Sequence, residues 1–379
     1  MGSGAAALLC TPLHEVHRRQ GARMVDFAGW DMPVQYPSGI LAEHQAVRTA
    51  CGIFDLSHMG RVRISGPDAL PLAQLCCTRD LARLRPGEAA YSLLCNEGGG
   101  ILDDVIAYVL GGNDILFVFN AANREQDAAW FCQHRDERQL RAEIDDQTHQ
   151  TALIGAQGPL AQTVLQDICN IDLGALPGYA FEAEVEVAGE HALVARTGYT
   201  GEDGFEVFVS AAHAPEVWDA LLESEHVTAC GLGARDTLRT EAGMPLYGHE
   251  LDQLTNPYEA RLGWVCNLHK AEFIGRETLA SAAGSAPKRL LVGLLVAPGG
   301  VPRPGFPLLD HDAQQVGSLT SGTFSPTLKR NIGMGYVPPE ISAPGQPLQV
   351  EMRGKPLGAE VVKLPFVPHR SRPRAKIKP

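Results

Sequence analysis

The sequence predicts an α+β protein of two or three domains in which the last domain is all β. The chain has 379 residues, which is too long for one compact core. Helix and strand patterns are mixed through residues 52–275, which is typical of sheets backed by helices. From Arg289 onward, short strands are interrupted by glycine and proline, which indicates a barrel or a sandwich.

The first two segments are expected to combine helices with a small sheet. Residues 11–50 predict one helix around Pro12–Gln20 and another over Ile40–Thr49, and they are too few to fold alone. Residues 52–145 predict an α+β layer. Its expected helices are Pro67–Leu75 and Asn123–His134, and its expected strands are Gly60–Ile64, Ala89–Leu94, Ile101–Leu110 and Ile115–Val118.

The third segment, residues 150–275, begins with a well-marked hairpin. Two alternating stretches, EAEVEVA and HALVART, flank an expected turn at Gly189-Glu190. Pro215 then stands where a helix tolerates proline, at the start of an apolar stripe. The small residues Ser281–Pro287 are expected to form the linker to the β domain.

A glycine-rich motif, GYTGEDGFEVFV at Gly198–Val209, precedes a predicted helix in GLGARDTLRTEAG. Its three glycines permit positive φ and close approach of other groups. Glu206 follows inside an apolar strand, where alternation places it on one face with Phe208. This acid needs a partner. Arg235 and Arg239, four residues apart on the helix, are expected to supply it or to bind a ligand carboxylate.

A second acidic feature is the adjacent pair Asp103 and Asp104, which begins a strand in NEGGGILDDVIAYVL. Neighbouring strand residues face opposite ways, so one of the two looks into the interior or a cavity. The residue pattern alone favours a turn-capping aspartate next to an exposed one.

Several familiar chemistries lack their motifs. The two histidines of HEVH are three residues apart rather than four, so no zinc site is expected. GLGARD has Asp236 where a dinucleotide fingerprint requires its third glycine, and GxxxxGK[ST] and G-x-S-x-G are absent. A net charge of -12 argues against nucleic acid as a partner.

Cysteine usage and hydropathy bear on location. The nine cysteines are odd in number and form no C-x-x-C pair, which favours buried thiols in a reducing compartment. No apolar run approaches the roughly 20 residues of a membrane helix. We therefore expect a cytoplasmic protein that does not bind a membrane.

Six stretches between about Thr11 and Pro368 are distinctive. They are GARMVDFAGWDMPVQY, AVRTACGIFDLSHMG, GGILDD, GYTGEDGFE, GLGARDTLRTEAGMPLYGHELD and TSGTFSPTLKRNIGMGYV. In sequence and in order, they closely resemble one family, the aminomethyltransferases, or T-proteins, of the glycine cleavage system.

The resemblance implies a three-domain, clover-like fold around a channel that holds tetrahydrofolate. The implied domains are residues 1–51 with 146–275, residues 52–145, and a C-terminal β barrel over residues 276–379. The implied reaction moves a one-carbon unit from the aminomethyl-lipoyl arm of the H-protein to tetrahydrofolate and releases ammonia. It implies no metal, flavin or nicotinamide.

The resemblance also implies roles for individual residues. Asp104 matches the essential aspartate, which we expect to be anionic at neutral pH and to stabilise the cationic character that develops as ammonia leaves. Glu206 matches the glutamate that binds the pterin, and Arg235 matches an arginine that binds folate. The other implied folate-site residues are Asn120, Val118, Met59, Trp264 and, as a clamp for the glutamyl carboxylate, Arg370.

Alternatives remain at this point. A non-catalytic folate-binding protein of iron-sulfur cluster maintenance shares the fold, but carries a K-G-C-Y-x-G-Q-E signature where this chain has MPLYGHELD. A folate-dependent demethylase of another small methylated substrate would differ only in the shape of its pocket. The basic stretch His369–Pro379 is expected to be a solvated tail or to attract an anionic ligand or partner.

Overall fold

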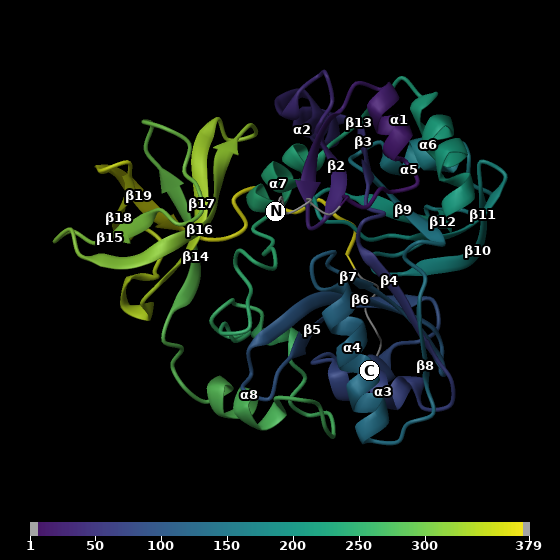
Figure 1. Cartoon of the computed structure of the whole chain (residues 1–379). Helices are drawn as coiled ribbons and strands as arrows, with labels where there is room; N and C mark the ends of the chain where they lie inside the picture. Colours follow the sequence, from purple (N-terminus) through teal and green to yellow (C-terminus); the bar gives the residue numbers. More distant parts are fainter. Residues whose placement is uncertain (1–6, 374–379) are drawn as a thin grey trace, which may run out of the picture.

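The computed structural model describes residues 7–373, which form three bodies (Figure 1). A six-stranded sheet and a five-stranded sheet lie on the right of Figure 1, and a closed six-stranded barrel lies on the left. A two-stranded hairpin, formed by β1 (Arg23–Phe27) and β2 (Trp30–Gln35), lies next to the six-stranded sheet. The mixed α+β class and the C-terminal barrel are confirmed.

The six-stranded sheet has the strand order β10-β11-β12-β9-β3-β13, and only β13 runs parallel to its neighbour β3. Its strands carry apolar residues on both faces. Helices pack on one face, and the five-stranded sheet, together with helix residues such as Val47 and Leu238, packs on the other. The strands are β3 (Cys51–Asp55), β9 (Thr151–Gln157), β10 (Phe181–Val187), β11 (Glu190–Ala195), β12 (Gly204–Ser210) and β13 (Val227–Ala229). The associated helices are α1 (His14–Arg19), α2 (Ile40–Thr49), α5 (Ala161–Gln166), η2 (Ala211–His213), α6 (Ala214–Leu222) and α7 (Leu232–Glu241).

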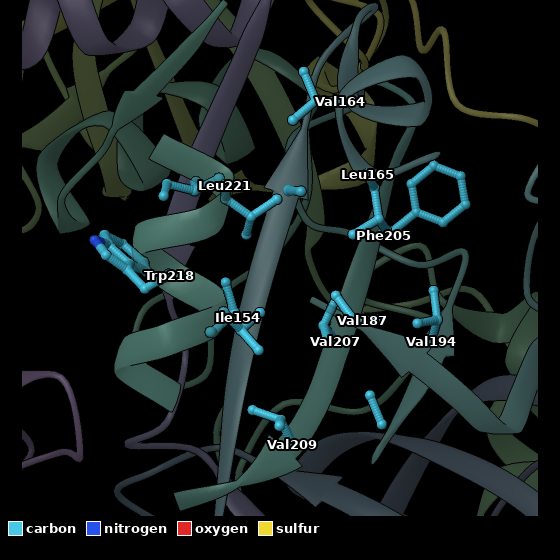
Figure 2. Packing of buried hydrophobic residues seen from close by; sticks show 14 of the residues in the cluster. Ile154, Val164, Leu165, Val187, Val194, Phe205, Val207, Val209, Trp218 and Leu221 are labelled. Carbon is cyan, nitrogen blue, oxygen red and sulfur yellow. The ribbon is translucent and has the colours of Figure 1, made fainter. Parts of the chain in front are cut away.

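One face of this sheet forms the largest apolar core. Figure 2 shows Trp218 and Leu221 of α6 beside Ile154 of β9 and Val207 of β12. Phe205 and Val209 belong to the same cluster, whereas Phe208 lies in a different cluster with Tyr108. The predicted alternation around Glu206 is therefore confirmed.

The five-stranded sheet is wholly antiparallel in the order β5-β6-β7-β4-β8. Helices α3 and α4 cover one face, and the opposite face packs against the six-stranded sheet through Tyr108, Leu116 and Val118. The strands are β4 (Gly60–Ser65), β5 (Glu88–Cys95), β6 (Ile101–Gly111), β7 (Asp114–Phe119) and β8 (Glu143–Asp146). The helices are α3 (Ala69–Cys76), η1 (Leu81–Arg83) and α4 (Arg124–Glu137).

A connecting segment, residues 243–288, runs along the edge of β5 and β6 before the barrel begins. It contains η3 (Gly263–Val265) and α8 (Arg276–Ala283), and its apolar residues pack on Leu93 and Ile101. The barrel follows in the order β14-β17-β16-β15-β18-β19. Its elements are β14 (Leu290–Val296), β15 (Pro307–Leu309), β16 (Gln315–Ser325), β17 (Arg330–Val337), η4 (Pro339–Ile341), β18 (Pro347–Met352) and β19 (Lys355–Val362).

Most predicted elements appear, with differences at their ends. The hairpin turn is Ala188-Gly189 rather than Gly189-Glu190, because both turn residues have positive φ and Glu190 already pairs with Val187. The predicted linker begins inside α8, since Ser281–Ala283 complete that helix. No helix between residues 7 and 373 is long and apolar enough to cross a membrane.

The division into three domains stays a prediction, but the strand pairing bears on its first boundary. The predicted boundary falls between residues 51 and 52, whereas β3 as a whole pairs with β9 and β13 of the six-stranded sheet. A division that respects this sheet begins the second unit after Asp55.

Candidate functional site

Asp104 lies on β6 and faces the six-stranded sheet. Strand alternation gives it the same side as Ile106 and Tyr108, and its side chain is only partly covered. Its Oδ1 accepts a hydrogen bond from Asn120 Nδ2 at 2.9 Å, and its Oδ2 accepts one from the Tyr91 hydroxyl at 3.1 Å. Asp104 is thus a carboxyl group held by two neutral donors and open on its remaining side.

Asp103 faces the opposite, helix-covered side of the sheet and is fully buried. It accepts hydrogen bonds from the backbone N–H of Asn120 at 3.0 Å, from Asn120 Nδ2 at 2.9 Å and from Asn123 Nδ2 at 2.6 Å. The expectation from residue pattern alone, a turn-capping aspartate beside an exposed one, was wrong. The tertiary structure buries one acid completely and covers the other in part.

The environment of Asp104 changes its acidity. Burial, followed by repulsion from Asp103, raises the pKa of Asp104 to about 7. The hydrogen bonds from Tyr91 and Asn120 act in the opposite direction but are weaker. Asp104 is therefore close to half protonated near neutral pH, which differs from the fully anionic state expected from the sequence.

Glu206 is buried on β12, opposite β11 and β9. Its Oε2 accepts hydrogen bonds from the Tyr108 hydroxyl, at 3.1 Å, and from the Thr197 hydroxyl. Within residues 7–373 these are the hydrogen bonds that the side chain of Glu206 makes, and both end at Oε2. Its Oε1 is therefore available to a donor from outside the chain.

Arg235 lies on α7 and does not form an ion pair within the described part of the chain. Its guanidinium rests over the ring of Tyr199, 4.8 Å from the centroid, and one of its nitrogens is 3.9 Å from the sulfur of Met59. Burial lowers the pKa of Arg235, while Tyr199 and Glu206 act to raise it. This cation is held by an aromatic face and a thioether, and it remains unneutralised.

Arg239, the second arginine of α7, has a structural role. Its guanidinium donates to Glu250 at 2.9 Å, to Asp236 at 2.7 Å and to Ser321 of the barrel at 2.7 Å. Neither of these arginines makes an ion pair with Glu206 in the described residues, because Tyr108 and Thr197 donate to it, and the other role expected for them, binding of a ligand carboxylate, stays a prediction. The two arginines diverge since one packs on Tyr199 and the other reaches the barrel.

These groups are electrostatic neighbours and form one site, which we call the central cluster: Asp104, Tyr91, Tyr199, Arg235, Glu206 and Tyr108. Burial raises the pKa of Tyr91, and Asp104 and Tyr199 raise it further. Asp104 and Arg235 both act on Tyr199, and Glu206 acts on Arg235. The cluster draws on β5, β6, β12, α7 and the glycine-rich loop, so it exists only once both sheets have packed together.

Three apolar residues predicted for the site differ in their exposure. Val118 is buried on β7, beside Ile106 of β6, and Met59 is partly buried against Arg235. Trp264 is 65% exposed, yet its ring stacks on Tyr91 with centroids 6.1 Å apart. Tyr91 also donates to Asp104, so Tyr91 lies between the exposed ring of Trp264 and that acid.

Arg370 does not contact the central cluster. Its guanidinium is 3.5 Å from Glu202 and 3.5 Å from the backbone oxygen of Arg48, and its N–H donates to Gly201 at 2.7 Å. The side chain is 56% exposed. Arg370 thus braces the glycine-rich loop from its outer side, and its role as a carboxylate clamp stays a prediction. Residues 374–379 of the basic tail lie outside the described residues.

The glycines of GYTGEDG have the physical roles expected of them. A Cβ on Gly198 would stand 2.0 Å from Gln157 Oε1, and one on Gly204 would stand 2.6 Å from the same side chain. Gly201 has φ +77°, in the left-handed region. The loop can therefore wrap around Gln157 and carry Tyr199 to the central cluster.

Sequence reasoning missed the tyrosines that complete the cluster. Tyr91, Tyr108 and Tyr199 read as ordinary strand and loop residues, and only the apolar strands around the first two hint at buried hydroxyls. Tyr179 is a further case, since it lies close enough to raise the pKa of both Tyr91 and Tyr108. Its φ of +59°, unusual for a bulky residue, carries no signal in the sequence.

Metal-binding groupings do not occur in this part of the molecule. Among residues 7–373, no three histidine, cysteine, aspartate or glutamate side chains are grouped so as to hold a metal ion. All nine cysteines are free, five of them are buried, and Cys10 is exposed.

Comparison with known proteins gives a consistent result. The GCVT N-terminal domain model matches residues 13–270, and the glycine cleavage T-protein C-terminal barrel domain model matches residues 289–368. An aminomethyltransferase of Geobacillus kaustophilus is 46% identical, over 94% of this chain and 98% of that protein. One of Rubrobacter xylanophilus is 50% identical, over 94% and 93%. The crystal structure of glycine cleavage system aminomethyltransferase T from Bartonella henselae superposes with a TM-score of 0.90 at 34% identity, covering 96% of this chain and 99% of that one.

The fold and the site define a class of protein in which two packed sheets enclose a cluster of polar and ionisable residues and a β barrel follows. Both family models match, in order and over most of the chain, and the identities far exceed what shared fold alone produces. The chain belongs to the aminomethyltransferase, or glycine cleavage T-protein, family.

Proposed function

We propose that this protein is the one-carbon transferase of glycine cleavage. It accepts the aminomethyl group carried by the lipoyl arm of the H-protein, transfers the one-carbon unit to tetrahydrofolate and releases ammonia. Family membership over nearly the whole chain supports the transferase activity. The observation that carries the proposal is Asp104, a partly open acid held by Tyr91 and Asn120 inside a tyrosine-lined cluster.

In this proposal Asp104 stabilises positive charge. Loss of ammonia from the aminomethyl group leaves a carbon with iminium character, and an adjacent carboxylate favours that state. An approaching cation also lowers the pKa of the carboxyl from about 7, so the anion forms where it is needed. A pKa near neutral further suits Asp104 for exchanging a proton with the departing amine or the folate nitrogen.

Glu206 and Arg235 are proposed to bind the folate. The amino and ring N–H groups of a pterin are donors, and Oε1 of Glu206 is an acceptor without a partner in the described part of the chain. Arg235 offers an unneutralised guanidinium to a carbonyl or carboxylate oxygen of the same ligand. Asn120, Val118, Met59 and Trp264 complete the proposed pocket, and Arg370 is proposed for the glutamyl tail.

The proposed co-substrate is tetrahydrofolate and the proposed protein partner is the lipoylated H-protein. The reaction as proposed needs no metal, flavin or nicotinamide. A cytoplasmic location, without nucleic-acid or membrane partners, stays a prediction that rests on cysteine usage and charge.

The alternatives are less well supported. A non-catalytic folate-binding protein does not need a paired and pKa-shifted acid, and the curated relatives carry the name aminomethyltransferase at 46–50% identity. A demethylase of a small methylated substrate would use the same folate pocket, and it differs in releasing no ammonia from the aminomethylated H-protein.

The decisive assay measures ammonia release from aminomethylated H-protein with and without tetrahydrofolate. We expect strong folate-dependent stimulation, matched mole for mole by methylene-tetrahydrofolate. Folate binding without ammonia release would refute the proposed reaction and favour a demethylase or a binding protein.

Two substitutions separate chemistry from binding. Asp104→Ala should abolish turnover and leave folate binding largely intact, whereas Glu206→Ala should weaken folate binding. Losing a hydrogen bond to a charged group costs about 1.5–3 kcal/mol, or roughly 10- to 150-fold in the dissociation constant. Asp219→Ala, an exposed aspartate on α6, is the control. Full activity in Asp104→Ala, or unchanged affinity in Glu206→Ala, would refute the assigned role.

A further inference from the structure

A third carboxyl group stands behind the two adjacent aspartates. Asp127 lies on α4, one turn after Asn123, and is 1% exposed. Within the described part of the chain, neither of its carboxyl oxygens has a hydrogen-bond donor. A buried carboxylate without a donor is among the most costly groups that a protein can contain. Asp127 therefore requires a specific explanation.

The explanation is its neighbour. The carboxyl groups of Asp127 and Asp103 are close enough to hydrogen bond with each other. Both oxygens of an ionised carboxyl are acceptors only, so such a bond requires one of the two acids to carry a proton. With a proton on Asp127, its carboxyl group becomes the donor of this bond and is no longer buried without a partner.

The hydrogen bonds around Asp103 decide which acid is protonated. Asp103 accepts three hydrogen bonds from Asn120 and Asn123, which favour its anion, while Asp127 has no donor of its own. Burial raises the pKa of both acids, but the hydrogen bonds to Asp103 act to lower its pKa, whereas burial and then Asp103 raise the pKa of Asp127 to about 11. This asymmetry favours the proton on Asp127 and the negative charge on Asp103.

The hydrogen bonds of Asp103 also connect it to Asp104. Asn120 Nδ2 donates to Asp103 Oδ1 and to Asp104 Oδ1, so a single amide spans both acids. In the described part of the chain, the side chains of Asn120, Asn123 and Tyr91 donate to the two acids, and none of these three is charged. The anion of Asp103 therefore acts on Asp104 without a neighbouring cation to offset it.

The other titratable groups around these carboxyls are known. Tyr247 of the connecting segment faces Asp103 and Asp127, which raise its pKa together with Asp252. Tyr91 of β5 and Tyr199 of the glycine-rich loop face Asp104. These tyrosines stay neutral at physiological pH because burial raises their pKa values. Asp103 thus supplies the negative charge next to Asp104.

We propose that Asp127 is a positioning residue that holds one proton against Asp103, keeps Asp103 anionic and so sets the protonation state of Asp104. This inference rests on the proposed function in one respect, since Asp104 is the reactive acid of that proposal. Asp127 does not touch the substrate. Its effect reaches the reaction through Asp103 and Asn120.

Removing the carboxyl group of Asp127 should lower the pH at which Asp104 titrates. In Asp127→Leu, Asp103 loses a donor that stabilises its anion and takes up a proton more readily. Its repulsion of Asp104 then weakens, and the titration midpoint of Asp104 falls by about one pH unit. Asp127→Asn retains a donor of the same size and should keep the midpoint. Asp103→Asn should lower the titration midpoint of Asp104. In the double variant Asp103→Asn/Asp127→Leu, the midpoint should fall no further.

The experiment is a carboxyl-carbon NMR titration of the full chain labelled at aspartate, without folate or H-protein. The resonance of Asp104 is identified by its loss in Asp104→Asn, and that of Asp127 by its loss in Asp127→Asn. Phe131→Leu, which also trims a buried side chain of α4, is the matched control for loosened packing. Because no substrate is present, the result does not depend on the proposed reaction.

Each outcome decides the proposal. A protonated Asp127 throughout pH 5–9, with a lowered midpoint for Asp104 in Asp127→Leu alone, supports it. An ionised Asp127 at pH 7 in the unaltered protein overturns it, and this measurement stands even where Asp127→Leu does not fold. Equal midpoints in all variants, or the same shift in Phe131→Leu, also overturn it. Failure of ammonia release with the expected titration would refute the proposed reaction alone.

Discussion

Replacing Asp104 by asparagine should make the protein more stable at neutral and alkaline pH. In the unfolded chain Asp104 ionises at the ordinary aspartate pKa of 3.8, whereas in the folded protein its pKa is raised to about 7. Between these values the folded state binds more protons than the unfolded state. The free energy of unfolding therefore falls as the pH rises through this window, and Asp104→Asn escapes that loss.

The structure sets the size of the effect. A difference of about three pH units corresponds to about 4 kcal/mol above pH 7, since one unit is worth 1.36 kcal/mol. Partial access to solvent reduces this, so we expect a gain of about 2–4 kcal/mol at pH 8 and none below about pH 4. The amide also fits, because its oxygen accepts from Asn120 as Oδ1 does, and the Tyr91 hydroxyl can turn to accept its N–H.

The assay uses calorimetry to measure the thermal unfolding of the unaltered protein and of Asp104→Asn, each at pH 5 and at pH 8. The unfolding temperature of Asp104→Asn should exceed that of the unaltered protein by several degrees at pH 8, and by clearly less at pH 5. Asp219→Asn, an exposed aspartate on α6, should show no such dependence. A variant that is equally stable or less stable at pH 8 would refute the raised pKa, and with it the argument that the site trades stability for reactivity.

Two further substitutions test how the site is held. Arg239→Met leaves Glu250 buried without its cation and should cost about 3–5 kcal/mol, seen as a lower unfolding temperature, whereas the exposed Arg85→Met should cost less than about 1 kcal/mol. Gly204→Ala places a methyl group 2.6 Å from the amide of Gln157 and should cost about 1–3 kcal/mol, while Gly112→Ala, with open space around it, should be nearly neutral. Unchanged melting in either buried variant would show that the packing described here does not restrain α7 or the loop.

Local pattern was sufficient for the elements that carry the site. The alternation of apolar residues placed Glu206 on the correct face of its strand, and the i, i+4 spacing placed Arg235 and Arg239 on one helix. Both results depend on local periodicity, since strand side chains alternate every two residues and helix side chains four residues apart share a face. The barrel was likewise predictable, because its turns are marked by glycine and proline.

The contacts between these elements were not predictable in the same way. Glu206 bonds to Tyr108, which is 98 residues away in the sequence, and Arg239 reaches Ser321 of the barrel. Such pairs arise when the two sheets and the barrel pack together. A local sequence pattern does not indicate which distant residue will contact Glu206 or Arg239. The resemblance of GGILDD and GYTGEDGFE to one family was needed to bring Asp104 and Glu206 into one hypothesis.

The adjacent aspartates show why this site spans a sheet instead of lying on it. Alternation along β6 sends Asp103 to the helix-covered side and Asp104 to the side of the central cluster, so the strand itself separates a buried charge from the acid that responds to it. The dry side can hold that charge because α4 brings a protonated carboxyl and Asn123 brings an amide. Separating the two acids by one strand therefore lets the protein shift the pKa of Asp104 while leaving its open face free for a ligand.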